Sequence, residues 1–140
     1  MSLMRFDFAS LPVMPWRNGG GETREIASWP VGTQDFDWRA SIATIAQDGP
    51  FSAFNGIDRS ITLLEGDGVH LFSVGHVDHH LSQVGEPFAF SGDVALGATL
   101  LGGSSQDFNI MTRRGRWAAD VQRVTKAIEL PTPHAGVLYV

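Results

Sequence analysis

The sequence predicts an all-β protein whose antiparallel strands form a sandwich, jelly roll or barrel. Short runs in which apolar and polar residues alternate dominate the chain, as expected for half-buried strands. Sixteen glycines and seven prolines interrupt these runs at short intervals. Few windows have the three-to-four-residue apolar spacing of an amphipathic helix. Regularly spaced short strands of this kind are typical of the three architectures named above.

The expected elements follow the alternation along the chain. A single helical turn is expected near residues 4–11. Strands are expected at residues 23–29, 37–46, 60–65, 68–74, 86–90, 95–102, 108–113, 119–127 and 136–140. The turn sequence EGDG at residues 65–68 predicts a hairpin between residues 61–64 and 69–72, because glycine supplies the positive φ that tight hairpins need.

Composition limits the classes of partner and chemistry. The length of 140 residues fits one domain, and 43% hydrophobic residues are ample for a core. A formal net charge of -5 argues against nucleic acid or an anionic membrane as partner. The absence of cysteine excludes disulfides, thiolate catalysis and thiolate metal ligation. Without a long apolar run or a signal-peptide pattern, we expect a soluble, cytoplasmic protein.

A glycine-rich loop precedes the first expected strand. Ordering the three consecutive glycines at residues 19–21 is entropically costly, so the loop is either a mobile tip or a close approach to another group. Its amides can form a concave anion site. Alternatively, the loop is a crossover at the mouth of the sandwich, with an indole as a packing plug. The candidate ligand-binding residues of this segment are Trp16, Arg17, Asn18, Glu22 and Thr23.

Two arginines are the leading candidates for contacts to an anion. Alternation within residues 37–46 puts Arg39 and Ser41 on one face, where a guanidinium fork and a hydroxyl can hold a carboxylate. The alternative is a solvent-facing arginine at a sheet edge. Arg59 opens another strand, at a rim where binding loops cluster. The alternative for Arg59 is a local ion pair with Asp58.

A third strand adds polar candidates. Asn109 alternates away from its apolar neighbours and shares a face with Met111 and Arg113. An inward amide and guanidinium would add polar contacts to an apolar cavity, the usual pattern of small-ligand sites. The run at residues 113–116 is also typical of a solvated turn.

Five separated motifs, in the same order, resemble the HutD/Ves family: PWRNGGGET (15–23), FDWRASIA (36–43), DGPFS (48–52), GIDR (56–59) and DFNIM (107–111). The resemblance implies one cupin-like domain over residues 1–140, an RmlC-like jelly roll with a small-molecule cavity between two facing sheets. It also implies a link to histidine catabolism, with members that bind rather than catalyse. Family members are usually longer, with further strands after the position of Val140.

The histidines do not match the pattern of enzymatic cupins, which hold a metal through two closely spaced histidines, a glutamate and a later histidine. A turn carrying His76, Asp78 and His80 offers suitable ligands for a divalent ion, but loop histidines are more often solvated. His70 and His134 are isolated in the sequence. We therefore expect no metal and no cofactor. No nucleophile elbow or fixed carboxylate pair is present, so no catalytic residue is predicted.

Three functional hypotheses follow. The first is a metal-free binder of a small carboxylate such as formylglutamate, urocanate or glutamate, with Arg39 and Arg59 as charge partners and Trp16, Phe51 and Phe54 as apolar walls. The second is an isomerase or hydrolase acting on a similar acid, with Glu22 or a loop histidine as general base. The third is an interaction module.

The apolar end of the chain motivates the third hypothesis. Residues 136–140 read as a strand that stops without a partner. Either the polypeptide continues, or this segment adds to a sheet edge in the chain or in a second subunit. A homodimer is therefore one expectation.

Overall fold

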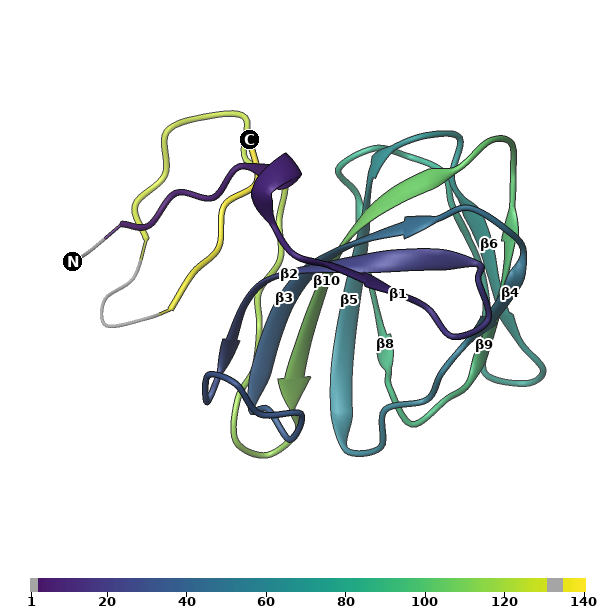
Figure 1. The fold of residues 1–140 in the computed structure, drawn as a ribbon, viewed down its shortest axis with the longest axis horizontal. Helices are drawn as coiled ribbons and strands as arrows, with labels where there is room; N and C mark the ends of the chain where they lie inside the picture. The colour runs from purple at the N-terminus through teal and green to yellow at the C-terminus, as the bar shows by residue number, and fades with distance from the viewer. Residues whose placement is uncertain (1–2, 131–134) are drawn as a thin grey trace.

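The computed structural model describes residues 3–130 and 135–140, and its regular structure is almost entirely β-strand (Figure 1). The described residues include one turn of 3-10 helix, η1 (Phe8–Ser10). The ten strands are β1 (Val13–Pro15), β2 (Gly21–Trp29), β3 (Trp38–Ile45), β4 (Gly49–Phe51), β5 (Ile57–Glu65), β6 (Val69–Ser73), β7 (Val77–Leu81), β8 (Pro87–Ser91), β9 (Leu96–Leu100) and β10 (Ser105–Arg113).

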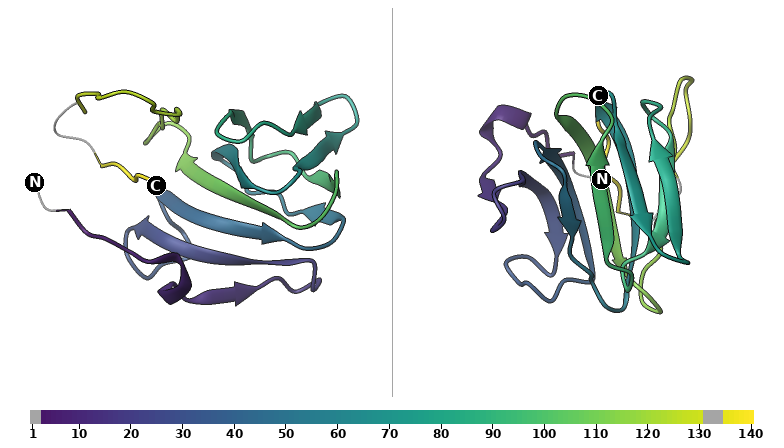
Figure 2. Two further views of the ribbon diagram at one scale, coloured as in Figure 1. Left: turned by 90° about the horizontal axis from the view of Figure 1, so that it is seen from above. Right: turned by 90° about the vertical axis from the view of Figure 1, so that its right-hand side faces the viewer.

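Two antiparallel sheets make up the fold, and Figure 2 shows them from two further sides. One has six strands in the order β1-β2-β3-β10-β5-β8, and the other has four in the order β4-β9-β6-β7. The chain crosses between the sheets several times, so neighbours in a sheet are often distant in sequence. The prediction of an all-β antiparallel protein is confirmed.

The main hydrophobic core lies between the sheets. It joins side chains from seven strands: Ile45, Phe51, Ile61, Leu63, Val69, Leu71, Leu81, Phe90, Leu96 and Ala98. Burying a side chain of valine, leucine or isoleucine size contributes about 1.5–3 kcal/mol each. Because a slip of one residue would turn a strand's apolar residues to the opposite face, this core determines which face of each strand points inward.

The turn at residues 65–68 is a corner between the sheets and not a hairpin, so that prediction is wrong. β5 pairs with β10 and β8, whereas β6 pairs with β7 and β9. Gly66 and Gly68 have φ values of 104° and 99°, so the turn does use positive φ as predicted. The two strands separate because both carry buried apolar residues that face each other across the core, which pairing within one sheet would prevent.

Several strand assignments also need correction. Residues 119–127 and 136–140 are not strands, although their residues alternate. Most of their side chains are exposed, and Val140 is fully so. A β-strand needs a neighbouring strand whose backbone groups accept and donate its hydrogen bonds. Alternation of apolar and polar residues within one segment does not provide that neighbour. Consequently the strand edge expected at residues 136–140 is not formed.

Three strands were missed, namely β1, β4 and β7. Two are only three residues long and contain proline, which obscures alternation. β7 replaces the expected turn at residues 76–80. Val77, His79 and Leu81 face inward on it, while Asp78 and His80 point outward and are exposed.

Substituting Gly68 with alanine tests the corner. An added Cβ would collide with the carbonyl oxygen of Leu81, and the φ of 99° is unfavourable for alanine. We expect Gly68→Ala to lower the free energy of unfolding by about 1–3 kcal/mol from the backbone conformation alone. Urea denaturation measures the loss. In the control Gly103→Ala, no atom lies within 4 Å of the new Cβ, so a change within about 0.5 kcal/mol is expected. Equal effects of the two substitutions would contradict this account of the corner.

Candidate functional site

The inner face of the six-stranded sheet carries a row of side chains from four strands. Met111 of β10 lies opposite Arg39 of β3 on one side and opposite Arg59 of β5 on the other. Arg59 in turn lies opposite Phe90 of β8. Residues directly opposite each other in a sheet point to the same face, so both arginines face the second sheet. The alternative of a solvent-facing Arg39 is not what the structure has.

Arg59 is the central cation of this row. Only 7% of the residue is exposed, and one guanidinium nitrogen donates a 3.3 Å hydrogen bond to Oδ1 of Asn109. Its Nε has no partner, and among the described residues no carboxylate oxygen lies within 4.0 Å of it. Burial, and then the positive charge of Arg39, lower the pKa of Arg59 to about 10. At neutral pH the guanidinium therefore remains charged, and the part of the chain that the structure describes supplies no carboxylate to pair with it.

Aromatic rings surround that guanidinium. Its Cζ lies 5.7 Å from the ring centre of Phe51, 5.2 Å from that of Phe54 and 5.1 Å from that of Phe90. These contacts offset part of the cost of burying the charge, since ring faces attract cations. Phe51 and Phe54 were predicted as apolar walls, and the structure places both beside Arg59. Phe90 was not singled out by sequence.

The positive charge of Arg39 is partly neutralised by a neighbouring acid. Its Nε lies 3.3 Å from Oε1 of Glu25, a neighbour from β2, although the approach lacks hydrogen-bond geometry. The side chain of Arg39 is 16% exposed and that of Glu25 is 46% exposed. Ser41 and Asn109 lie opposite each other in the next row and are both buried. The structure thus brings together Arg39, Ser41, Arg59 and Asn109, four of the predicted residues.

Asp107 is a buried acid that sequence reasoning missed. It is 0% exposed, and its Oδ1 accepts a 2.9 Å hydrogen bond from the Ser105 hydroxyl, while Oδ2 has no partner. Burial raises the pKa of Asp107 to about 7, against the opposing effect of the Ser105 hydrogen bond. The alternation that placed Asn109 inward also places Asp107 inward, two residues away or about 7 Å along β10. The signal was therefore present in the sequence.

The glycine-rich loop lies at the other end of the sheet. The carbonyl of Gly20 accepts hydrogen bonds from Ala46 and Gln47, beyond Ile45 at the end of β3. Ile45 is six residues from Arg39, or about 20 Å along an extended strand. Gly19 donates to the carbonyl of Trp16, and Gly20 donates to the Asn18 side chain, so these amides are satisfied within the loop.

The side chains of this segment separate into two groups. Trp16 packs against the main core, lies edge-on to Phe51 at 5.8 Å, and donates a 2.8 Å hydrogen bond to Thr23 Oγ1. That placement matches the packing-plug alternative. Arg17 and Asn18 are exposed at the loop tip, and Glu22 lies on the outer face of β2. The structure does not bring these three side chains to the arginine row.

Arg113 and Arg114 are paired with acids. Arg113 donates to Oδ1 of Asp35 at 2.6 Å and to the carbonyl of Phe36 at 2.8 Å. Arg114 bonds Asp58 at 2.9 Å and Asp93 at 3.0 Å. These partners raise the pKa of Arg114, while backbone and Arg114 hydrogen bonds lower that of Asp93. Asp58 therefore pairs with Arg114, so the alternative of an Asp58–Arg59 pair is wrong.

A concavity of about 380 Å³ lies behind this row, on the outer face of the same sheet. Its lining consists of Asp58, Ser60, Ala89, Ile110 and Thr112, of Arg59 and Phe90, whose side chains alternate to the inner face, and of Ala118 and Ala119. Its side chains are mostly small and neutral. The inner row combines an uncompensated cation with an amide, a hydroxyl and rings, so the inner row is the better candidate for a ligand site.

Two facing antiparallel sheets joined by repeated crossings are the architecture of cupin-like proteins. A cupin barrel-domain protein from Salinispora arenicola CNS-205 superposes with a TM-score of 0.54 at 14% identity, covering 81% of this chain and 90% of that one. The cupin-like fold predicted from sequence is confirmed.

Within that class, the chain belongs to the HutD family, whose pattern matches residues 9–139. Protein Ves of Escherichia fergusonii is 47% identical over 136 residues, which are 96% of this chain and 71% of Ves. The structure of HutD from Pseudomonas fluorescens SBW25, determined in a formate condition, matches with a TM-score of 0.70 and 39% identity. That match covers 76% of this chain and 58% of HutD, so the chain spans little more than half of this solved relative.

Among the described residues, no helix is both long and apolar enough to cross a bilayer.

Replacing Asp107 with asparagine tests its protonation in the folded protein. A folded-state pKa near 7, against an ordinary value of 3.8, means that the folded protein holds the proton more tightly than the unfolded chain. In the wild-type protein, the contribution of the Asp107 carboxyl to the free energy of unfolding is fully present below about pH 4 and is lost as the pH rises to about 7. Asp107→Asn cannot ionise, so its advantage over wild type should grow by roughly 1.4 kcal/mol per pH unit in that range and then level off.

Denaturation curves at pH 5, 6, 7 and 8 measure this difference. Asp120→Asn, at an exposed position in the tail, serves as the control and should show no such trend. A stability difference between Asp107→Asn and wild type that stays constant across the series would refute the assignment.

Proposed function

We propose that this protein binds a small carboxylate between its sheets and modulates histidine catabolism in the cytoplasm. Candidate ligands are formylglutamate, urocanate and glutamate. The observation that carries the proposal is the charge of Arg59, which is buried beside Asn109 and three rings without a carboxylate partner. The name of the relative HutD supports the link to histidine utilisation.

An uncompensated buried charge is costly. Even after local relaxation, burying an ion costs several kcal/mol, and a stable fold normally offsets this with a paired charge and further hydrogen bonds. The rings and the single 3.3 Å hydrogen bond of Arg59 supply only part of that compensation. A ligand carboxylate would supply the rest, because the guanidinium fork can donate two parallel hydrogen bonds to it.

Arg39, in the same row as Arg59, and the polar residues of the next row suit a small organic acid. Arg39 offers a second cation, which favours a dicarboxylate such as formylglutamate or glutamate. Ser41 and Asn109 offer a hydroxyl and an amide, and the rings of Phe51, Phe54 and Phe90 suit the planar, conjugated body of urocanate. These alternatives share the carboxylate, which is the part of the ligand that Arg59 addresses.

The same positions argue against recognition of the ligand through a bound metal ion. Arginine, phenylalanine, serine and asparagine are not usual ligands of a protein-bound transition metal, and the thioether of Met111 suits only soft ions such as copper(I). We therefore propose charge pairing, and not coordination, as the means of recognition there.

Asp107 favours an enzyme as the second candidate function. A buried carboxyl group with a pKa of about 7, one row from Asn109, has the protonation behaviour expected of a general acid or base. It replaces Glu22 in that role, since Glu22 lies on the outer face. The reaction would be isomerisation or hydrolysis of the same class of acid.

We also propose that the protein binds neither nucleic acid nor an anionic membrane, and that it can form a homodimer. The net charge of -5 supports the absence of nucleic acid and anionic membrane partners. A homodimer is supported only by open strand edges such as β7, which has β6 as its single neighbour in the described sheets. Light scattering measures the oligomeric state directly.

Isothermal titration with each of the three acids tests the binding proposal. We expect at least one of them to bind, and Arg59→Met to weaken that affinity about ten- to hundredfold, because a charged hydrogen-bonded contact is worth about 1.5–3 kcal/mol. Methionine keeps an apolar stem of similar length. Arg5→Met, which removes an exposed arginine, is the matched control and should leave the affinity unchanged.

The titration also has a clear negative outcome. No heat with any of the acids at millimolar concentration, for a folded protein, would exclude them as ligands. An equal loss in Arg59→Met and Arg5→Met would show that only long-range charge is involved.

Proton NMR of each acid, mixed with the protein, separates the two candidate functions. Unchanged acid spectra together with shifted protein resonances support a binder. A new product spectrum that disappears in Asp107→Asn supports the enzyme.

A further inference from the structure

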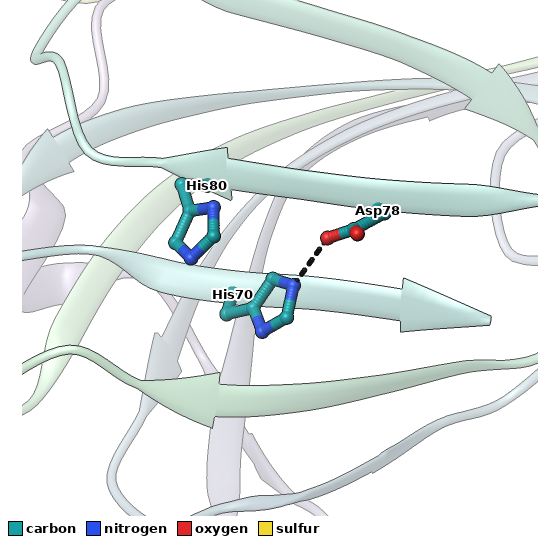
Figure 3. Close-up of side chains that lie close together, drawn as sticks. All are labelled: His70, Asp78 and His80. Carbon is teal, nitrogen blue, oxygen red and sulfur yellow. Dashed lines mark hydrogen bonds and ion pairs between the residues drawn. The ribbon is translucent and has the colours of Figure 1, made fainter. Parts of the chain in front are cut away.

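Three metal-ligating side chains meet on the outer face of the hairpin formed by β6 and β7 (Figure 3). His70 of β6 lies directly opposite His80 of β7. Asp78 precedes His80 by two residues, so alternation puts it on the same face. His79 lies on the inner side, where its ring stacks on Phe88 at 3.9 Å. His70 is distant from the later histidines in the sequence, and it is the pairing of β6 with β7 that brings them together.

The geometry within this group is close. His70 Nε2 lies 2.6 Å from Oδ1 of Asp78. The rings of His70 and His80 are parallel within 1°, with their centres 4.2 Å apart. One potential ligand atom from each of the three residues lies within 4.8 Å of the others.

We propose that His70, Asp78 and His80 bind one divalent transition-metal ion, of which zinc is the best fit, with water completing the coordination. Two imidazole nitrogens and one carboxylate oxygen are common zinc ligands. The nitrogen ligands disfavour magnesium and calcium, which take oxygen ligands. The site is open on the solvent side, which leaves room for water.

The distances permit this without moving the backbone. With bonds of 2.0–2.1 Å, ligand atoms around a tetrahedral zinc lie roughly 3.3 Å apart. The present separations of up to 4.8 Å can close to that value by side-chain rotation. Such rotation is unhindered at Asp78, whose side chain is 68% exposed, and His70 is 29% exposed.

Core packing does not account for the group. The core contacts of β6 and β7 come from Val69, Leu71 and Leu81 on the inner face. An ion pair between His70 and Asp78 at the surface would contribute little stability, because solvent screens it. A metal ion, by contrast, would join β6 to β7, whose only strand neighbour in the described sheets is β6.

The proposed metal site is independent of the proposed carboxylate site. It lies on the outer face of the four-stranded sheet, whereas the arginine row lies on the inner face of the other sheet. Loss of either site would therefore leave the other intact.

Zinc titration of the tag-free full chain, after treatment with a chelator, tests the proposal. We expect saturable binding of one equivalent. Removing an outer-shell partner of a metal ligand typically weakens affinity about 10–100-fold, so removing a ligand itself in His70→Ala or His80→Ala should weaken it by at least about tenfold. His76→Ala, which removes an exposed histidine from the turn before β7, should have no effect.

Two further measurements keep the result interpretable. Circular dichroism checks that each variant is folded, and Asp78→Asn provides a variant that keeps both histidines. Bound cobalt(II) should show visible absorption typical of a four-coordinate ion, lost in His80→Ala and kept in His76→Ala. No saturable binding at millimolar zinc, unchanged affinity in either ligand variant, or an equal loss in His76→Ala would overturn the proposal.

Discussion

A positive charge held between two β-sheets, with no carboxylate partner among the described residues, is the constraint on which the candidate site depends. Arg59 occupies an inward position of β5 between Ile57 and Ile61, both almost fully buried, and little of the residue is exposed to water. Three phenylalanine rings lie beside that charge, and Asn109 accepts a hydrogen bond from it. The neighbouring cation Arg39 lies 3.3 Å from Glu25.

Alternation along single strands was the reliable part of the sequence information. It placed Arg39 with Ser41 and Asn109 with Met111 on shared faces, and the strand registers agree. The relation between strands could not be derived in the same way. The EGDG turn looked like a hairpin because local sequence specifies a turn and its φ values, but the partner of each strand depends on which buried faces meet across the core. Residues 119–127 alternate just as well and yet have no neighbour to pair with.

For the candidate site too, alternation within a strand could be read from the sequence, whereas contacts between strands could not. Period two placed Arg39 and Asn109 on their strand faces, whereas Arg59 was expected at a rim where a strand begins, and the structure instead places it inward within β5. Asp107 was overlooked although the same rule applied to it, and Phe90 required knowledge that β8 lies beside β5. Arg113 could not be assigned correctly from sequence, since its partner Asp35 lies 78 residues away along the chain. Likewise, the meeting of His70 with Asp78 and His80 depends on β7 being a strand, which its polar sequence concealed.

Phe51 contacts both the buried cation and an indole. Its ring centre lies 5.7 Å from the Arg59 guanidinium carbon, and it meets the ring of Trp16 edge-to-face at 5.8 Å. The emission of an indole depends on the electric field and on the packing around it, and both change when a neighbouring charge is neutralised. Trp16 therefore gives the protein an optical reporter of its own, set one ring away from Arg59, that needs no attached dye.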